Sequence, residues 1–291
     1  MKYSIAQQSL TGARASNQDR ALTLESEHAV LIAVADGLGG HAGGALAADT
    51  FVQELARAFR AQHGPRIERP IAFLAACIEQ AHRSIVALGR AQTPPITPRT
   101  TCVIALIQDG VATWAHVGDS RLYHFRGAQL LTRTVDHSVT EEMHNAGLLE
   151  EAQMAKHTFK SKLTNCLGGP SAPEATYGRA TVLEPDDLLL LCTDGVWQAF
   201  SSDDLAEHLS ADTLEEGLDD MLDAAEKTMR KRCDNVTAAA LRWLDKPGKL
   251  EPVRHPRRAL PVTPTADRSA LPIDAELREI EKLLDQFNTR R

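Results

Sequence analysis

The sequence is poor in aromatic residues and holds few cysteines. Phe, Trp and Tyr make up 4% of the 291 residues, and the five cysteines are scattered without a C-x-x-C pair. An odd number of cysteines, scattered along the chain, argues against a disulfide framework or a zinc site and favours reduced thiols. No segment has the uninterrupted apolar length of a transmembrane helix, and the N-terminus lacks the pattern of a signal peptide. We therefore expect a cytoplasmic protein with no membrane partner.

The sequence also has no excess of basic residues over acidic ones. The formal net charge is −7, from 32 Lys and Arg against 39 Asp and Glu. This balance argues against nucleic acid as a partner. With 43% hydrophobic and 24% charged residues, the composition is ordinary for a globular protein with a sizeable core. An acidic body fits a protein that gathers carboxylates around a metal.

The chain is organised around residues 31–44. The apolar run 31–35 predicts a short buried strand, which leads directly into Asp36 and a glycine-rich loop. Glycine lets the backbone approach an ion or a ligand closely. A carboxylate at a strand end, with free carbonyl groups around it, suits a hard divalent cation.

Two other interpretations of this loop are possible. Gly37, Gly39 and Ala42 have the spacing of a dinucleotide-binding loop. Asp36 would then place a negative charge beside the pyrophosphate, and the ribose-binding acid expected about twenty residues later is replaced by the basic stretch 57–60. The dinucleotide hypothesis is therefore disfavoured. An ordinary tight turn with a helix cap stays open on this stretch alone.

Further aspartates occupy similar positions along the chain. Apolar strands are predicted at 3–11, 20–25, 28–35, 100–108, 111–118, 188–192 and 236–243. Asp119 and Asp194 follow two of these strands beside a glycine, Asp234 precedes the last one, and Asp19 lies in the polar loop after the first. Each alone is typical of a turn, but the repetition favours a shared site.

Several carboxylates cannot stay close together unpaired, because like charges raise each other's pKa steeply. Divalent cations resolve the conflict, and an all-oxygen ligand set selects magnesium, manganese or calcium over zinc. Paired hard ions can make a water acidic and hold a phosphoryl group for attack. Arg14, otherwise a solvated surface residue, would supply the bidentate contact that phosphate oxygens favour.

The other predicted elements are mainly helical. Helices are expected at 42–62, 70–91 and 213–230, with a short one near 203–205. The polar stretch 136–169 is weakly periodic and predicts a helical excursion of functional, mobile character. Four histidines are interpreted as packed, surface or flap residues and not as ligands: His82, His137, His144 and His157.

Taken together, the motifs resemble those of a known family. The chain is similar to bacterial protein phosphatase 2C enzymes, the metal-dependent PPM-type serine/threonine phosphatases. The motifs lie in family order over about residues 3–243: Arg14-x-x-Asn17-Gln18-Asp19, Asp36-Gly37-Leu38-Gly39-Gly40-His41, Thr100-Thr101, Gly118-Asp119-Ser120-Arg121, Asp136-His137-Ser138, Leu163-Thr164-Asn165-x-Leu167-Gly168, Thr193-Asp194-Gly195-Val196-Trp197 and Asp234-Asn235-Val236-Thr237.

The resemblance implies an α+β fold, a four-layer α-β-β-α sandwich in which two antiparallel sheets are flanked by helix pairs. It also implies a centre with two tightly bound Mn²⁺ or Mg²⁺ ions and a third, weaker one. The implied metal ligands are Asp36, the carbonyl of Gly37, Asp119, Asp194 and Asp234, while Asp19 holds metal-bound water and Arg14 grips the phosphate. Residues 137–165 become the flap beside the cleft.

Two positions depart from the family pattern. Gln18 stands where a glutamate is frequent, and Leu38 stands where some animal members carry a proposed general-acid histidine. His41 lies three residues further on, and no protein acid is assigned.

The implied activity is hydrolysis of phosphoserine and phosphothreonine in proteins by a metal-activated hydroxide. The expected partners are phosphorylated proteins, and by analogy a bacterial Ser/Thr kinase or its target, including the kinase of type VI secretion. The alternative is a non-catalytic binding module on the same fold, which the presence of Asp36, Asp194 and Asp234 disfavours.

The end of the chain lies outside the family pattern. The phosphatase domain is predicted to span residues 1–245, and residues 246–272 hold six of the fourteen prolines, as in a linker. Apolar residues at helical spacing then predict an amphipathic helix over 273–291. Docking of this helix on its own catalytic domain is favoured slightly over docking on a second copy or a kinase-pathway protein.

Overall fold

The computed structural model describes residues 1–39, 42–62, 64, 66–154 and 157–248. Residues Met1–Leu250 form one compact unit. The predicted helix over 273–291, and the predicted linker beyond residue 248, lie outside the described residues.

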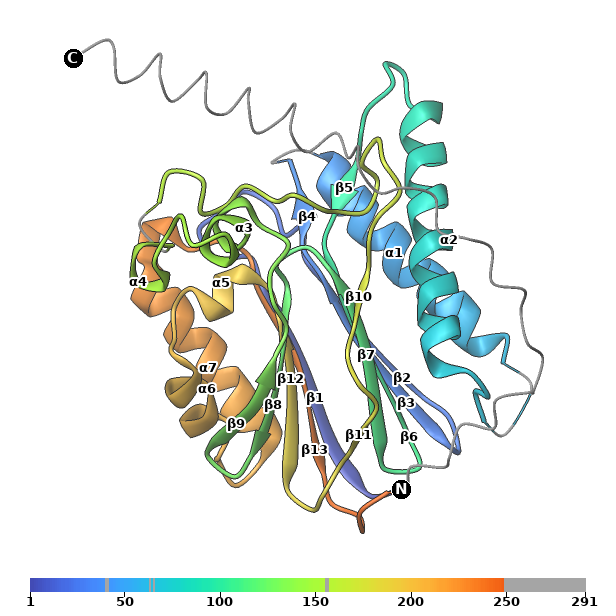
Figure 1. The fold of residues 1–291 in the computed structure, drawn as a ribbon, viewed down its shortest axis with the longest axis vertical. Helices are drawn as coiled ribbons and strands as arrows, with labels where there is room; N and C mark the ends of the chain where they lie inside the picture. The colour runs from blue at the N-terminus through green and yellow to red at the C-terminus, as the bar shows by residue number, and fades with distance from the viewer. Residues whose placement is uncertain (40–41, 63, 65, 155–156, 249–291) are drawn as a thin grey trace. The chain divides into compact units, whose positions relative to one another are not determined.

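Two antiparallel sheets stand face to face (Figure 1). In spatial order, one sheet contains β1 (Tyr3–Leu10), β13 (Val236–Trp243), β12 (Asp187–Cys192), β8 (Arg121–Arg126) and β9 (Gln129–Arg133). The other contains β10 (Thr176–Tyr177), β7 (Val111–Val117), β6 (Cys102–Gln108), β3 (Ala29–Ala35) and β2 (Arg20–Glu25), with β11 (Thr181–Val182) also paired to β7. A small ribbon of β4 (Gly37–Leu38) and β5 (Arg99–Thr100) lies above the second sheet.

Helix pairs cover the two outer faces. Helices α1 (Ala42–Arg60) and α2 (Pro70–Ala91) pack on the β3–β6 sheet, and α6 (Ser202–His208) and α7 (Leu214–Met229) pack on the β12–β13 sheet (Figure 1). Three short helices lie near the upper edge of the sheets in that view: α3 (Val139–Asn145), α4 (Glu151–Met154) and α5 (Asp194–Trp197). This arrangement confirms the predicted four-layer α-β-β-α sandwich.

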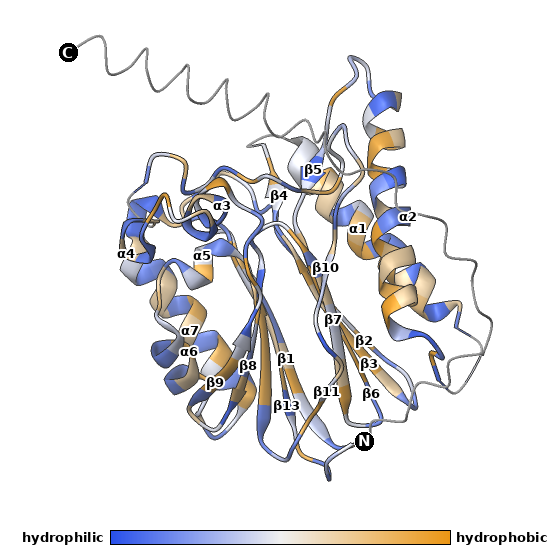
Figure 2. Ribbon diagram, viewed as in Figure 1, coloured by the Kyte–Doolittle hydropathy of each residue, from blue (hydrophilic) through white to orange (hydrophobic). Residues whose placement is uncertain are grey.

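Burial on both faces explains why the central strands are continuously apolar. Along β3, Leu31 and Ala33 face the helices α1 and α2, whereas Ile32 and Val34 face the opposite sheet. Successive side chains of a strand point to opposite sides, so a strand between two cores must be apolar at every position. Figure 2 shows the same division, with hydrophobic residues along the strands and on the sheet-facing sides of the helices.

Helix α2 is, by length and composition alone, long and apolar enough to cross a membrane, although no such segment was expected. Its apolar face instead contributes Leu74, Ile78, Ala81 and Ile85 to the core against the β3–β6 sheet. A core helix passes the same test of length and composition. The apolar character of α2 is therefore explained by packing in this fold.

The region 136–169 differs from its prediction. Among its described residues, which exclude 155–156, only α3 and α4 are α-helical, and the others form turns, bridges and extended chain. Ser138 caps α3 by accepting a hydrogen bond from the backbone N–H of Glu141, and Ser138 and Leu163 form an isolated antiparallel bridge. The predicted helical excursion is therefore limited to two short helices, because few apolar anchors exist here to stabilise a longer helix.

Candidate metal centre and active site

The sheet register brings five aspartates to one edge of the sandwich. Asp19 precedes β2 and Asp36 follows β3, and these strands pair Arg20 with Ala35. Asp119 lies between β7 and β8, Asp194 begins α5 directly after β12, and Asp234 precedes β13. Because β8 pairs with β12 and β12 with β13 at these same ends, residues distant in sequence meet at one place.

Glycines allow the loops of this edge to pack closely. A Cβ on Gly37 would lie 2.4 Å from the carbonyl oxygen of Gly44, and one on Gly195 would lie 2.1 Å from the carbonyl oxygen of Asn235. Real Cβ atoms do not approach backbone so closely. The glycines beside Asp36 and Asp194 are therefore required for the loops to converge.

Threonine side chains form hydrogen bonds with Asp36 and Asp19. The backbone N–H of Asp36 donates to Thr101 Oγ1 at 3.0 Å, and Thr100 Oγ1 donates to the carbonyl oxygen of Asp36 at 2.8 Å. Thr193 Oγ1 donates to Asp19 Oδ2 at 2.8 Å. These bonds fix the position of both residues from the scaffold side.

The carboxylates raise one another's pKa values. Burial raises the pKa of Asp36 and of Asp194 well above the ordinary value, and the charges of the other site aspartates raise both further. Burial raises the pKa of Asp119 to about 7, with the charge of Asp136 as the next cause. Burial also raises the pKa of Asp19 to about 6, against the effect of its hydrogen bonds. The edge is thus an acidic cluster that is unfavourable without compensation.

The donor set of this cluster fits hard divalent cations. It consists of two buried carboxylates, Asp19 and Asp119, and three partly exposed ones, without histidine or cysteine. Such oxygen ligands suit Mg²⁺ or Mn²⁺. Within the described residues, no three acidic, histidine or cysteine side chains stand close enough to form a complete ligand group. Mg²⁺ usually keeps several waters and takes one or two carboxylates. The cluster therefore fits ions that bind a few carboxylates each and complete their shells with water.

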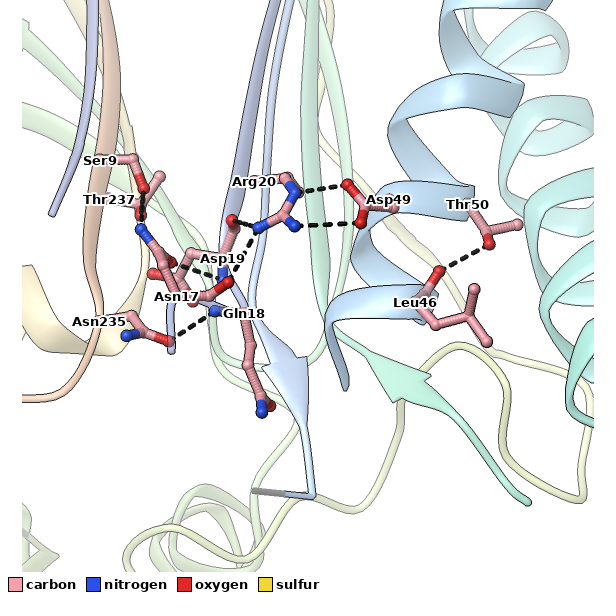
Figure 3. A network of polar contacts seen from close by, with 10 residues as sticks. All are labelled: Ser9, Asn17, Gln18, Asp19, Arg20, Leu46, Asp49, Thr50, Asn235 and Thr237. Carbon is pink, nitrogen blue, oxygen red and sulfur yellow. Dashed lines mark hydrogen bonds and ion pairs between the residues drawn. The ribbon is translucent and has the colours of Figure 1, made fainter. Parts of the chain in front are cut away.

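A network of polar contacts anchors the loop between β1 and β2 (Figure 3). Asn235 Oδ1 accepts the backbone N–H of Gln18 at 2.8 Å, while Asn235 Nδ2 donates to the carbonyl oxygens of Thr11 and Ser16. Asn17 Nδ2 donates to Ser9 Oγ at 2.8 Å. These hydrogen bonds hold both Arg14 and Asp19 beside the start of β13, and this role of Asn235 and Asn17 was not predicted from the sequence.

Arg14 lies at the site but not in an unpaired state. Its Nη2 donates to Asp234 Oδ2 at 2.7 Å, and 57% of its side chain is exposed. The hydrogen bond and charge of Asp234 raise the pKa of the guanidinium. The structure therefore brings Arg14 to the predicted cluster and gives it a partner that the sequence did not reveal.

A second arrangement supports Asp119. Arg121 donates from Nε and Nη2 to the two oxygens of Asp136 at 2.8 and 2.7 Å, and its guanidinium stacks 3.6 Å above the ring of Trp197. Trp197 Nε1 in turn donates to the carbonyl oxygen of Asp119 at 3.0 Å. The motifs around Arg121, Asp136 and Trp197 were noted in the sequence, but their roles were missed.

Two of the predicted non-ligand histidines, His137 and His82, make contacts with the scaffold. His137 stacks on His116 with ring centroids 4.7 Å apart, and its Nδ1 accepts the backbone N–H of Gly118. Burial lowers the pKa of His137 to about 4. His82 Nδ1 accepts the backbone N–H of Gly168. These contacts support the predicted packing roles, and they make His137 a partly buried residue at the base of the flap.

Comparison with known proteins identifies the family. The profile of the family Protein phosphatase 2C matches residues 7–241. A phosphatase 2C-type protein of Streptococcus pyogenes is 29% identical over 228 residues, covering 78% of this chain and 91% of its own. The serine/threonine phosphatase of S. agalactiae has a similar structure, with a TM-score of 0.76 at 29% identity over 84% of this chain and 100% of its own.

A structure with metal ions is also similar. The catalytic domain of the serine/threonine protein phosphatase PstP, in complex with two manganese ions, matches with a TM-score of 0.70 at 26% identity. The match covers 84% of this chain and 99% of that chain. The chain therefore belongs to the protein phosphatase 2C family of metal-dependent protein serine/threonine phosphatases.

Proposed function

We propose that this chain hydrolyses phosphoserine and phosphothreonine in proteins with Mn²⁺ or Mg²⁺ ions held at the five-aspartate edge. Asp36, the carbonyl of Gly37, Asp194 and Asp234 hold two tightly bound ions, and Asp119 with Asp194 holds a third, weaker one. The observation that carries this assignment is the convergence of five carboxylates, among which burial and mutual charge raise the pKa values of Asp36 and Asp194.

Bound ions supply Lewis acidity, which lowers the pKa of a water and stabilises charge on the phosphoryl oxygens. The chain's own residues arrange the reaction around them. Asp19, fixed by Thr193, accepts hydrogen bonds from water and thereby orients it. The threonine contacts to the backbone of Asp36 fix the position from which its side chain extends into the site.

Arg14 binds the substrate phosphate in this proposal. Its present partner, Asp234, is also an assigned metal ligand. A carboxylate oxygen that binds a cation is a weaker acceptor for the Arg14 guanidinium. Because the Arg14 side chain is long and largely exposed, it can turn from Asp234 to two phosphate oxygens in the loaded enzyme. Guanidinium groups favour this bidentate geometry.

The physiological setting is part of the same proposal. We infer that the substrates are phosphorylated proteins in the bacterial cytoplasm and that the enzyme opposes a Ser/Thr kinase there. A kinase of type VI secretion is one such setting, and it rests on analogy alone. The predicted C-terminal helix, which lies outside the described residues, is proposed to be dispensable for the chemistry.

The decisive experiment is release of phosphate from a phosphothreonine peptide, with and without Mn²⁺. The proposal predicts turnover that requires the ion and is abolished by a chelator. A phosphopeptide that binds to the folded protein but is not hydrolysed at any Mn²⁺ concentration would refute catalysis and favour the binding-module alternative.

A further inference from the structure

Three consecutive basic residues stand directly before Asp234. Arg230, Lys231 and Arg232 form the short 3₁₀ helix η1 and are all exposed. Among the described residues, no carboxylate lies within ion-pair distance of them. We call these three residues the basic rim, and they contrast with the acidic helix α7 that precedes them.

The basic rim lies beside the phosphate-binding side of the site. The backbone N–H of Ala13 donates to the carbonyl oxygen of Cys233 at 3.1 Å. A Cβ on Gly12 would lie 1.9 Å from the carbonyl oxygen of Asp234, so the loop that carries Arg14 packs tightly on the segment after η1. Consecutive Cα atoms are about 3.8 Å apart. The Cα atoms of Lys231 and Arg232 therefore lie within about 12 Å of that of Asp234, which Arg14 contacts.

The chain enters η1 through an unusual backbone conformation. Arg230 has φ 52° and ψ −127°, a backbone conformation that residues other than glycine rarely adopt. This conformation ends α7 and starts the turn that leads into Asp234. Strained conformations of this kind persist where the surrounding structure requires them and are frequent at functional positions.

We propose that the basic rim is a subsite for an anionic group that flanks the phosphorylated residue of the substrate. The subsite deepens the proposed function and rests on it. A phosphate at Arg14 leaves the residues two or three positions away within reach of Lys231 and Arg232, because an extended chain advances about 3.3–3.6 Å per residue. Arg and Lys clusters recognise carboxylate and phosphate groups. The ligand is therefore an acidic side chain or a second phosphate on the same peptide.

The charge of the molecule makes this local cluster significant. The chain has a net charge of −7, so its long-range field disfavours acidic substrates. A basic patch next to the site offsets this unfavourable field at the place where the peptide binds, and thereby gives specificity for anionic peptides. Basic residues after a helix also interact favourably with its dipole. That effect alone would alter thermal stability but would not alter the choice between peptides.

The experiment compares kcat/KM among peptides built on one phosphothreonine. The peptides differ at the second and third positions before and after the phosphothreonine. One series has neutral residues there, one has Asp and Glu, and one has a hydrolysis-resistant phosphonate. We expect the wild-type chain to favour an anionic peptide over the neutral one by roughly 3- to 10-fold, since each exposed charge pair contributes about 1.4- to 5-fold. The preference should fall at high salt, and the better of the two anions identifies the ligand.

Two double variants locate the preference. Lys231→Gln with Arg232→Gln should reduce the ratio of anionic to neutral peptide to within about 1.5-fold, and the corresponding Glu variant should invert it, as expected for exposed charge pairs. The matched control is Arg60→Gln with Arg69→Gln, two exposed arginines. They flank Ile67, which bonds Gln108 at the far end of β6. The control should keep the wild-type ratio.

The outcomes separate this inference from the phosphatase assignment. If the wild-type chain shows Mn²⁺-dependent turnover but the ratio is the same in the basic-rim variants, the subsite is refuted and the phosphatase stands. Variants with a lower melting temperature and an unchanged ratio would assign the basic residues to helix stability alone. No Mn²⁺-dependent turnover of any peptide would refute both.

Discussion

Replacing Asp119 with asparagine should stabilise the metal-free protein, and the gain should depend on pH. Asp119 is buried, and burial raises its pKa from 3.8 to about 7. Between these two pH values the folded protein holds a proton at Asp119 that the unfolded chain has released. The contribution of this residue to stability therefore falls as pH rises from about 4 to about 7.

The size of the effect follows from the pKa shift. One pKa unit corresponds to about 1.36 kcal/mol, so a shift of about three units amounts to about 4 kcal/mol in the free energy of unfolding. Asparagine has nearly the same shape and no charge. The stability gain of Asp119→Asn over the wild type should therefore rise between pH 4 and pH 7 by an amount on the order of 4 kcal/mol. The buried histidines, whose pKa values are lowered, act oppositely in both proteins and cancel in the difference.

Urea unfolding in the presence of a chelator, repeated from pH 4 to pH 8, measures this difference. Asp220→Asn is the matched control, because Asp220 is an exposed residue of α7. Saturating Mn²⁺ should reduce the advantage of Asp119→Asn, since a ligand that binds only the folded state stabilises it. A gain that does not change with pH, or one that the control also shows, would refute the reasoning.

Three further changes test the site, the core and the tail. Arg14→Ala should raise KM for a phosphopeptide about tenfold, because loss of one charged hydrogen bond costs about 1.5 kcal/mol. Unchanged KM and kcat would mean that Arg14 pairs with Asp234 and does not bind the phosphate. Leu190→Ala should lower the free energy of unfolding by about 2–5 kcal/mol, since Leu190 is fully buried between β12 and α7, and a smaller loss in urea unfolding would mean that the core closes around the gap. A chain that ends at Gly248 keeps the Lys246 carbonyl that Trp243 Nε1 contacts and should hydrolyse a small aryl phosphate at near wild-type rate; a large loss in folded protein would show that the tail supports the site.

Local patterns predicted the scaffold well. The range 236–243 coincides with β13 and the range 70–91 with α2, because an apolar strand and an amphipathic helix each carry their period in consecutive residues. The aspartates at strand ends were found for the same reason. Each follows or precedes an apolar run, and antiparallel pairing then brings these ends together.

Contacts between distant residues could not be predicted in this way. Asn235 binds the carbonyl oxygen of Ser16 across 219 positions of sequence, and the pair of Arg14 with Asp234 spans 220. No periodicity links such positions, so the tethers of the β1–β2 loop and the partner of Arg14 appear only in the fold. The prediction for the flap gave no helix bounds for another reason, since its few apolar residues leave the helix period too weak to define where α3 ends.

Binding of Mn²⁺ measured by titration calorimetry tests the central claim most directly. Asp36 interacts with all four other aspartates of the cluster, so its charge should matter most for the ions. The wild-type protein and Asp220→Asn should bind two ions tightly, and Asp36→Asn, with an unchanged circular dichroism spectrum, should lose that binding. Equal binding of Mn²⁺ by Asp36→Asn and the wild type would show that the five-aspartate edge is not the metal centre.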